Sequence, residues 1–253
     1  MSEPQPATGL RAPLFANRAR LAHWRQQDLR VIAYGLVLLL AWDASGADLA
    51  LTRLFGTASG FAWRNHWLFE RVLHDGAAWC MRAVFVLLAI NIVSPLPLIG
   101  AMPRSLRLRW WLVSLGCALL IALLKRQSLI SCPWSLAEFG GSAWHIAHGS
   151  LAAWWGAGDG GPGRCFPAGH ASNAFALITG WFALREVSPR VARAWLAGAC
   201  ALGAVFAFTQ LVRGAHFASH SLWTAWICWS ASALVWHAAQ AAATVRAAVL
   251  RPH

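Results

Sequence analysis

The chain has 253 residues, of which 58% are hydrophobic and only 12% charged, and its formal net charge is +12. Soluble domains carry about 25% charged residues, and a chain of this length cannot bury so large an apolar fraction in one soluble core. The composition therefore excludes an ordinary soluble protein and indicates that lipid is the main solvent. Net positive charge alone is compatible with nucleic-acid binding, but the distribution of the arginines favours membrane topology instead.

Apolar runs recur along the chain, and each is close to the roughly 20 residues that a spanning helix requires. We expect an all-α, polytopic membrane protein with six transmembrane helices. Residues 1–30 would be a cytoplasmic N-terminal segment without a cleaved signal peptide, followed by a membrane domain over 31–240 and a cytoplasmic tail over 241–253. The predicted spans cover residues 31–50, 77–95, 108–128, 168–184, 194–212 and 218–240.

The arginines predict the orientation of these spans. Segments 1–30, 96–107, 185–193 and 241–253 are rich in arginine and contain few acids, and the segments on the opposite side contain most of the acids. This is the positive-inside pattern, which places both termini in the cytoplasm. The acids on the opposite side are Asp43, Asp48, Glu70, Asp75, Glu138 and Asp159.

Two segments between the spans are rich in aromatic residues. Residues 51–76 are too polar to cross a bilayer and predict an interfacial helix, although Glu70, His74 and Asp75 within it could approach a site on that face. The loop 131–167 is rich in Gly and Trp. Its aromatic residues are typical of the belt at headgroup depth, and contact with a lipid substrate is the alternative.

The cysteines divide into two groups. Those inside the predicted spans (Cys80, Cys117, Cys200 and Cys228) are interpreted as small packing residues. Cys132 and Cys165 are predicted outside the cytoplasm, where a disulfide between them is plausible. Two free thiols, or a metal site shared with His145 and His148, remain open, although the spacing matches no standard zinc template.

Polar residues of an unusual kind stand at the edges of the apolar runs. Ionisable groups near lipid are costly, so in a membrane protein they are candidates for function. The first of these residues is the only lysine, Lys125, seven residues before Cys132-Pro133. The others are in Pro167-Ala168-Gly169-His170 and at Arg213, His216 and His220. With the predicted topology, all of these residues would lie at the non-cytoplasmic face.

The order and spacing of these residues resemble the three-part signature of the type 2 phosphatidic acid phosphatase (PAP2) superfamily. In that family the first motif is Lys, six residues, Arg-Pro, and the second is Pro-Ser-Gly-His. The third is Ser-Arg, five residues, His, three residues, Asp. This chain keeps the lysine, the prolines and both histidines, whereas the substituted positions are Cys132, Ala168, Thr209, Gln210 and His220.

The resemblance implies a reaction and residues for it. His216 would be the nucleophile that forms a phosphohistidine, and His170 would protonate the leaving group. Phosphate would be bound by Lys125, Ala168 and Gly169, without a metal or another cofactor. We expect arginines at shifted positions to replace the missing family arginines in the phosphate clamp. These arginines are Arg213 and Arg164, with Arg126, Gln210 and His220 in supporting positions.

The role of His220 is left open by the sequence. An aspartate at this position would orient the imidazole and stabilise its charged form, whereas a neutral His220 adds no negative charge. His220 could instead bind substrate while Asp159, Glu138 or a backbone carbonyl orients His216. His216 and His220 at i and i+4 could also be zinc ligands on one helical face, but no third ligand at a fixed spacing accompanies them.

The resemblance also implies a substrate class and a location. The substrate would be a phosphorylated membrane lipid, such as phosphatidic acid, phosphatidylglycerol phosphate, undecaprenyl diphosphate or a lipid A phosphate. The protein would lie in a bacterial inner membrane, with its active site facing the periplasm. A lipid phosphotransferase, and a non-catalytic protein that binds or translocates a phosphorylated lipid, are the alternatives. Nucleic acid is not an expected partner, and the oligomeric state is not predicted.

Overall fold

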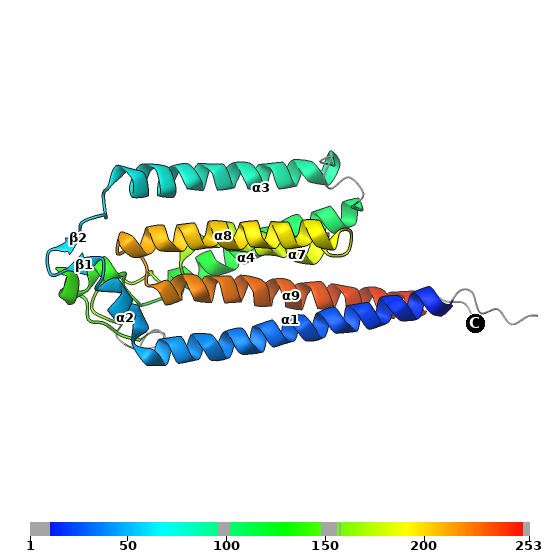
Figure 1. Cartoon of the computed structure of the whole chain (residues 1–253), viewed down its shortest axis with the longest axis horizontal. Coiled ribbons are helices and arrows are strands. Elements are labelled where there is room, and N and C mark those ends of the chain that lie inside the picture. The colour runs from blue at the N-terminus through cyan, green and yellow to red at the C-terminus, as the bar shows by residue number, and fades with distance from the viewer. Residues whose placement is uncertain (1–10, 96–101, 148–155, 157, 250–253) are drawn as a thin grey trace, which may run out of the picture.

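The computed structural model describes residues 11–95, 102–147, 156 and 158–249 and is a bundle of helices (Figure 1). A two-stranded hairpin, β1 (Gly56–Thr57) and β2 (Gly60–Phe61), lies at one end of the bundle. In chain order the α-helices are α1 (Arg11–Ser45), α2 (Ala47–Thr52), α3 (Ala77–Val93), α4 (Arg104–Gln127), α6 (Gly169–Phe175), α7 (Thr179–Leu184), α8 (Pro189–Val212) and α9 (Ala218–Val249). The shorter helical elements are the π-helix η1 (Leu68–Gly76) and the 3-10 turns η3 (Pro133–Ser135), η4 (Ala137–Phe139) and η5 (Ala176–Ile178).

The centre of the bundle is the segment formed by α6, η5 and α7. It contacts α4, α8 and α9, and almost all of its residues are buried. Small residues allow this close approach: a Cβ atom at Gly203 of α8 would overlap the ring of Phe175, and one at Gly180 of α7 would overlap the indole of Trp195. The catalytic candidate on α6, His170, is therefore held by a closely packed core.

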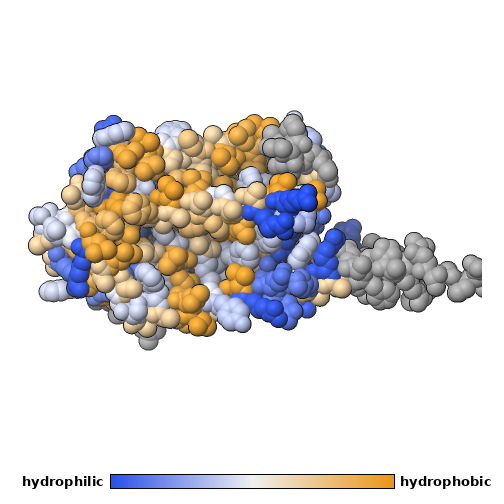
Figure 2. All heavy atoms as spheres, in the orientation of Figure 1, coloured by the Kyte–Doolittle hydropathy of each residue, from blue (hydrophilic) through white to orange (hydrophobic). Residues whose placement is uncertain are grey.

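The helices are compatible with a membrane environment. Leu68–Val93, Arg104–Gln127 and Pro189–Val212 are long and apolar enough to cross a bilayer, and they overlap the second, third and fifth predicted spans. Leucine, valine and other large apolar side chains are exposed on the outer faces of α1, α3, α4 and α8. Figure 2 shows this apolar surface over the middle of the bundle and hydrophilic residues near the end where α1 begins. That the other three runs also cross the membrane stays a prediction.

The fourth predicted span, 168–184, has a different form from the expected single helix. It is interrupted by the 3-10 turn η5, and it is surrounded by other helices rather than placed at the surface. At 1.5 Å per residue, its 16 helical residues would cover only about 24 Å. The predicted boundary between the cytoplasmic segment and the membrane domain, at residue 30, falls inside the continuous helix α1 and stays a prediction.

The prediction of an interfacial helix over 51–76 is wrong. Residues 56–61 form the hairpin instead, because Gly60 adopts φ +102° and Gly56 has no room for a side chain beside the rings of Phe61 and Phe139. Positive φ is readily available only to glycine. Helix begins again at Leu68 as η1, which continues directly into α3.

A buried ion pair joins three helices near the opposite end of the bundle. Both guanidinium NH groups of Arg185, which follows α7, donate to the carboxylate of Asp28 on α1, at 2.9 and 2.7 Å. His237 of α9 lies 2.8 Å from the same carboxylate. Arg185, the first residue of the arginine-rich segment 185–193, is therefore also a structural residue.

We expect Asp28→Ala to destabilise the fold by about 3–5 kcal/mol, because removal of one partner leaves the buried guanidinium of Arg185 uncompensated. Thermal unfolding of the detergent-purified protein measures this effect. Arg53→Ala is the matched control, since it breaks the exposed Arg53–Glu138 pair and should cause no measurable change. Equal melting temperatures for Asp28→Ala and the wild type would contradict a structural role for the pair.

Candidate active site

The candidate site lies where helix ends from distant parts of the sequence meet. The last turn of α4, the first turn of α6, the end of α8 and the start of α9 lie at the same end of the bundle as the hairpin (Figure 1). This arrangement brings Lys125, His170 and His216 together, close enough for the charges of the first two to act on the third.

Lys125 lies against the N-terminus of α6. The absence of a side chain at Gly169 makes this possible, since a Cβ atom there would be 3.3 Å from Cδ and 3.4 Å from Nζ of Lys125. The lysine is half-buried, in the last turn of α4. Its ammonium group and the first backbone N–H groups of α6 thus face the same region, which is an arrangement that favours an anion.

His170 is held in the first turn of α6 by contacts from η1 and α8. Its Nε2 lies 3.2 Å from the carbonyl oxygen of Leu73, to which an N–H at this position donates. One face of the ring stacks on His74, with centroids 4.5 Å apart, and Phe206 lies 4.7 Å away. The bond to Leu73 leaves Nδ1 as the nitrogen available for proton transfer.

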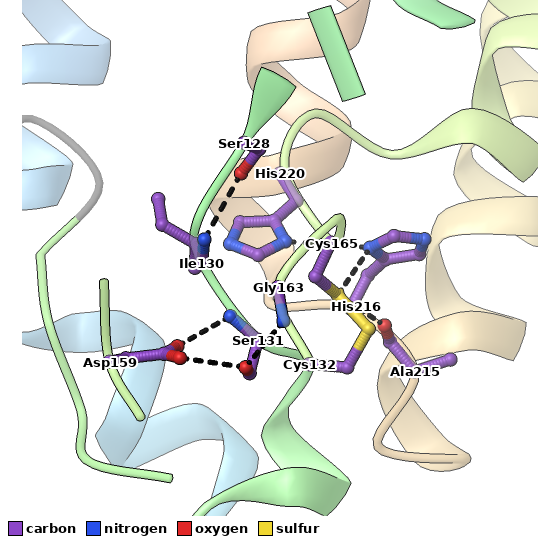
Figure 3. The surroundings of a disulfide bond; sticks show 10 residues. All are labelled: Ser128, Ile130, Ser131, Cys132, Asp159, Gly163, Cys165, Ala215, His216 and His220. Atoms are coloured by element: carbon purple, nitrogen blue, oxygen red, sulfur yellow. Dashed lines mark hydrogen bonds between the residues drawn. A yellow bond between two sulfur atoms is a disulfide. The ribbon is translucent and has the colours of Figure 1, made fainter. Parts of the chain in front are cut away.

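His216 follows α8 in a tight turn and is almost fully buried. Its Nδ1 lies 3.4 Å from Nδ1 of His220 and 3.3 Å from Sγ of Cys165 (Figure 3). Burial lowers the pKa of His216 well below its usual value, and the positive charge of Lys125 lowers that pKa further. His216 is therefore neutral near pH 7, as a nucleophilic imidazole must be.

Backbone contacts join the second and third candidate motifs. The N–H of Ala168 donates to the carbonyl of His220 at 3.1 Å, and the hydroxyl of Thr224 donates to the carbonyl of Ala168 at 3.1 Å. The start of α9 is capped by Asp48 of α2, whose carboxylate accepts the Ser219 N–H at 3.0 Å. No pattern in the sequence indicates this role of Asp48, because the capping carboxylate is distant in sequence from Ser219.

Arg213 faces η1. Its Nε donates to the carbonyl of Arg64 at 2.9 Å, and its terminal nitrogen lies 3.8 Å from the carboxylate of Glu70. Burial lowers the pKa of Arg213, and the carboxylates of Glu70 and Asp75 oppose this shift. The guanidinium remains charged in any case, so η1 provides a carboxylate partner for a cation beside the site.

A cavity of about 360 Å³ opens between α4 and α6. Three cations line it, namely Lys125, Arg126 and Arg164. Arg126 and Arg164 are exposed, so neither is paired within a buried core. The remaining lining residues are small or polar: Ala118, Ala122, Gly169, Ser172 and Asn173.

Cys132 and Cys165 are joined by a disulfide, which fastens the loop after α4 to the segment before α6 (Figure 3). Since both sulfurs are oxidised, the 3.0 Å approach of Cys165 Sγ to the Ala215 carbonyl oxygen is a contact without a hydrogen. His145 is not part of this pair, and His148 lies outside the described residues.

Two carboxylates considered as partners of His216 are occupied elsewhere. Asp159 accepts hydrogen bonds from the backbone and hydroxyl of Ser131 and from the N–H of Gly161. Glu138 pairs with Arg53. His220 instead occupies the position beside Nδ1 of His216, and the carboxylates stabilise the surrounding loops.

The family model described as the PAP2 superfamily matches residues 107–243, more than half of the chain. The chain belongs to the PAP2 superfamily. Neither the curated proteins nor the solved structures contain a match to it. Membership of this superfamily indicates phosphatase or phosphotransferase chemistry, and the apolar helices are compatible with membrane association.

The PAP2 signature positions that differ in this chain have identifiable surroundings. Gln210, at the position of the family arginine, is buried, and its backbone carbonyl accepts the N–H groups of Ala215 and His216. Cys132, at the other arginine position, is in the disulfide. Both positions therefore contribute to the shape of the turn around His216 and carry no positive charge. That Arg213, Arg164 and Arg126 replace the family arginines stays a prediction.

Proposed function

We propose that this PAP2 protein is a membrane lipid phosphatase that acts through a phosphohistidine on His216. The observation that carries the proposal is the environment of His216, a buried neutral imidazole whose Nδ1 faces His220. With the Nδ1 proton directed to His220, Nε2 carries the lone pair that can attack phosphorus. A hydrogen-bond partner on one ring nitrogen fixes the tautomer of the imidazole, so that the other ring nitrogen can act as the nucleophile.

In the first step, His216 Nε2 forms a bond to phosphorus as the bond from phosphorus to the lipid oxygen breaks. His170, protonated when the anionic phosphate is bound beside it, gives its Nδ1 proton to the departing oxygen. In the second step, a water molecule transfers a proton to His170 and attacks the phosphohistidine, which releases phosphate and restores His216. Lys125 and the N-terminus of α6 stabilise the charge on the non-bridging oxygens, where preorganised electrostatics contribute most of the rate.

The proposed substrate is a phosphate or diphosphate on a membrane lipid, hydrolysed at the periplasmic side of a bacterial inner membrane with both termini in the cytoplasm. Two observations support a lipid substrate: the site lies at the end of a bundle with an apolar outer surface, and cationic residues line the cavity beside α6. A phosphotransferase would use the same first step and differ only in the acceptor.

Phosphate release by the purified protein tests this function. The assay uses a panel of lipid monophosphates and diphosphates in detergent, with EDTA present throughout. Release that persists in EDTA supports metal-independent histidine chemistry. Folded protein that forms a phosphoenzyme, releases no phosphate, and gives a phosphate ester when an alcohol acceptor is added would identify a transferase. Folded protein that forms no phosphoenzyme and releases no phosphate would refute the proposal.

We expect Arg213→Ala to lower kcat/KM for a lipid phosphate by about 10–100-fold, because a charge-assisted contact to an anion contributes about 1.5–3 kcal/mol. Arg213→Lys should retain part of the activity, since lysine keeps the positive charge but lacks the planar guanidinium group that makes two parallel hydrogen bonds. Arg109→Ala is a control for loss of an arginine from the same bundle, because Arg109 lies over Trp236, outside the proposed site. An unchanged rate for Arg213→Ala would remove Arg213 from the clamp.

The low pKa of His216 predicts acid destabilisation. Below about pH 6.5 the unfolded chain takes up a proton at this residue that the folded protein excludes, so stability decreases as the pH falls. Thermal unfolding between pH 7.5 and pH 5 should therefore show a steeper loss of stability in the wild type than in His216→Gln. Parallel curves for the two proteins would contradict this assignment.

A further inference from the structure

The disulfide and the candidate nucleophile form one compact group. Sγ of Cys132, Sγ of Cys165 and a ring nitrogen of His216 all lie within 4.8 Å of one another. Among the residues that the structure describes, no other set of three or more His, Cys, Asp or Glu side chains is this close. Figure 3 shows that the group comes from three segments: the loop after α4, the segment before α6 and the turn before α9.

The spacing of the donor atoms is close to that of a tetrahedral zinc site. With Zn–S near 2.3 Å and Zn–N near 2.0–2.1 Å, neighbouring sulfur and nitrogen ligands lie about 3.5 Å apart and two nitrogens about 3.4 Å apart. Nδ1 of His216 lies 3.3 Å from Cys165 Sγ and 3.4 Å from His220 Nδ1. The two sulfurs would have to separate, from a covalent bond to about 3.8 Å.

We propose that reduction of the Cys132–Cys165 disulfide creates a binding site for a thiophilic divalent cation such as Zn²⁺, and that the bound cation inactivates His216. The ligands are the thiolates of Cys132 and Cys165 and Nδ1 of His216, with His220 or water in the fourth position. Two thiolates and an imidazole are a donor set that selects zinc over magnesium or calcium. The inactivation rests on the proposed function, whereas the metal site does not.

The reduction requires a dithiol reductant. One of its thiolates attacks Sγ of Cys132, the partly exposed partner, and Cys165 leaves as the buried thiolate beside His216. The second thiol of the reductant then displaces Cys132, which leaves two protein thiols and an oxidised dithiol. Binding of the divalent cation releases two protons from the thiols, and the resulting site of two thiolates and one dication is neutral, which suits a buried position.

A cation on Nδ1 is incompatible with nucleophilic attack. Coordination uses the Nδ1 lone pair, so the ring proton must move to Nε2. Nε2 then carries an N–H in place of the lone pair that would attack phosphorus. In the oxidised form Nδ1 faces His220 and the Cys165 sulfur, so the ring proton can stay on Nδ1 and Nε2 keeps its lone pair. Phosphate transfer and metal binding are therefore mutually exclusive states of His216.

Cobalt binding to the full chain in detergent tests the site directly, because Co²⁺ bound by thiolates shows a sulfur-to-metal charge-transfer band. We expect the dithiol-reduced protein, freed of excess reductant, to bind one Co²⁺ per chain with this band and to lose it when Zn²⁺ is added. The oxidised protein is the matched control, because it retains the free cysteines Cys80, Cys117, Cys200 and Cys228. An equal band in both forms would overturn the site.

Two variants assign the ligands. In the reduced protein, Cys132→Ser should remove the band, and His216→Ala should weaken Co²⁺ binding by at least about tenfold, the scale of loss seen even for partners outside the ligand shell. Cys117→Ser changes a buried thiol outside the group and should bind as the wild type does. Retention of wild-type binding by Cys132→Ser, with the reduced wild type shown to be folded, would refute the assignment.

Phosphate release tests the inactivation independently of metal binding. The reduced protein should hydrolyse its lipid substrate in EDTA. Its rate should fall in proportion to the fraction of protein that has bound Zn²⁺, by at least about tenfold at saturation, and EDTA should restore it. The oxidised protein should be insensitive to Zn²⁺. Metal binding without loss of activity would overturn the inactivation. If neither form hydrolysed any lipid phosphate, the proposed function would fail while the cobalt spectrum still decided the metal site.

Discussion

His216→Gln is expected to lower phosphate release from the lipid substrate by about 10³-fold or more, because loss of a nucleophile removes the whole covalent pathway rather than one contact. Gln is closer in size to His than Ala is and preserves packing against Cys165. Release of inorganic phosphate under single-turnover conditions measures the chemical step. The same variant should form no acid-labile, base-stable phosphoenzyme, whereas the wild type quenched during turnover should contain one.

The control for this experiment is His23→Gln, which changes an exposed histidine on α1, at the end of the bundle far from the site. It should retain the wild-type rate and phosphoenzyme. A phosphoenzyme that persists in His216→Gln would show that another residue is the nucleophile. Binding of lipid phosphate with no phosphoenzyme in the wild type would favour the non-catalytic alternative, a protein that binds a phosphorylated lipid.

The residues of the site were predictable from the sequence because they are rare in an apolar chain. Lys125 is the only lysine, and its distance from Cys132-Pro133 and the later His170 and His216 set a pattern independent of tertiary structure. The arginine distribution then predicted that these residues share one end of the bundle. The structure places them together there, although their catalytic roles remain proposals.

The partners of these residues were not predictable in the same way. Asp159 and Glu138 were reasonable candidates for orienting His216 because their charge is visible in the sequence, but local loop contacts to Ser131 and Arg53 occupy them. His74, which stacks on His170, belongs to η1, whose π-helical form no hydrophobic period distinguishes. Single π-helical turns are frequent at functional sites.

The errors over the fold have a related cause. Residues 51–76 were interpreted from aromatic content, which describes depth in the membrane and not backbone conformation. The hairpin that Gly56 and Gly60 allow was therefore missed. Similarly, counting Arg185 and Asp28 as separate charges in cytoplasmic segments could not reveal that they form a buried pair. Composition predicts whether a segment lies in lipid or in water, whereas the pairing of two charged side chains depends on tertiary contacts.

The role proposed for His170 predicts a dependence on the leaving group. His170→Asn should slow hydrolysis of a lipid alkyl phosphate by about 10²–10⁴-fold, the usual contribution of general acid catalysis. An aryl phosphate with an acidic phenol needs no proton to depart, so its phosphohistidine should form in His170→Asn at nearly the wild-type rate. Rapid-quench measurement of this step with the two substrates separates proton donation from binding, which would affect both equally.

His74→Asn is the matched control, because it removes the stacked neighbour of His170 but leaves the proposed acid in place. It should slow the two substrates by a similar and smaller factor, below about tenfold, since stacking of two rings contributes about 0.5–1.5 kcal/mol. The comparison decides between two functions for a histidine at the start of α6. If His170→Asn lost the same factor with alkyl and aryl phosphates, His170 would bind phosphate rather than protonate the leaving oxygen. The acid would then have to be another group within reach of the site, for which His74 is the nearest candidate.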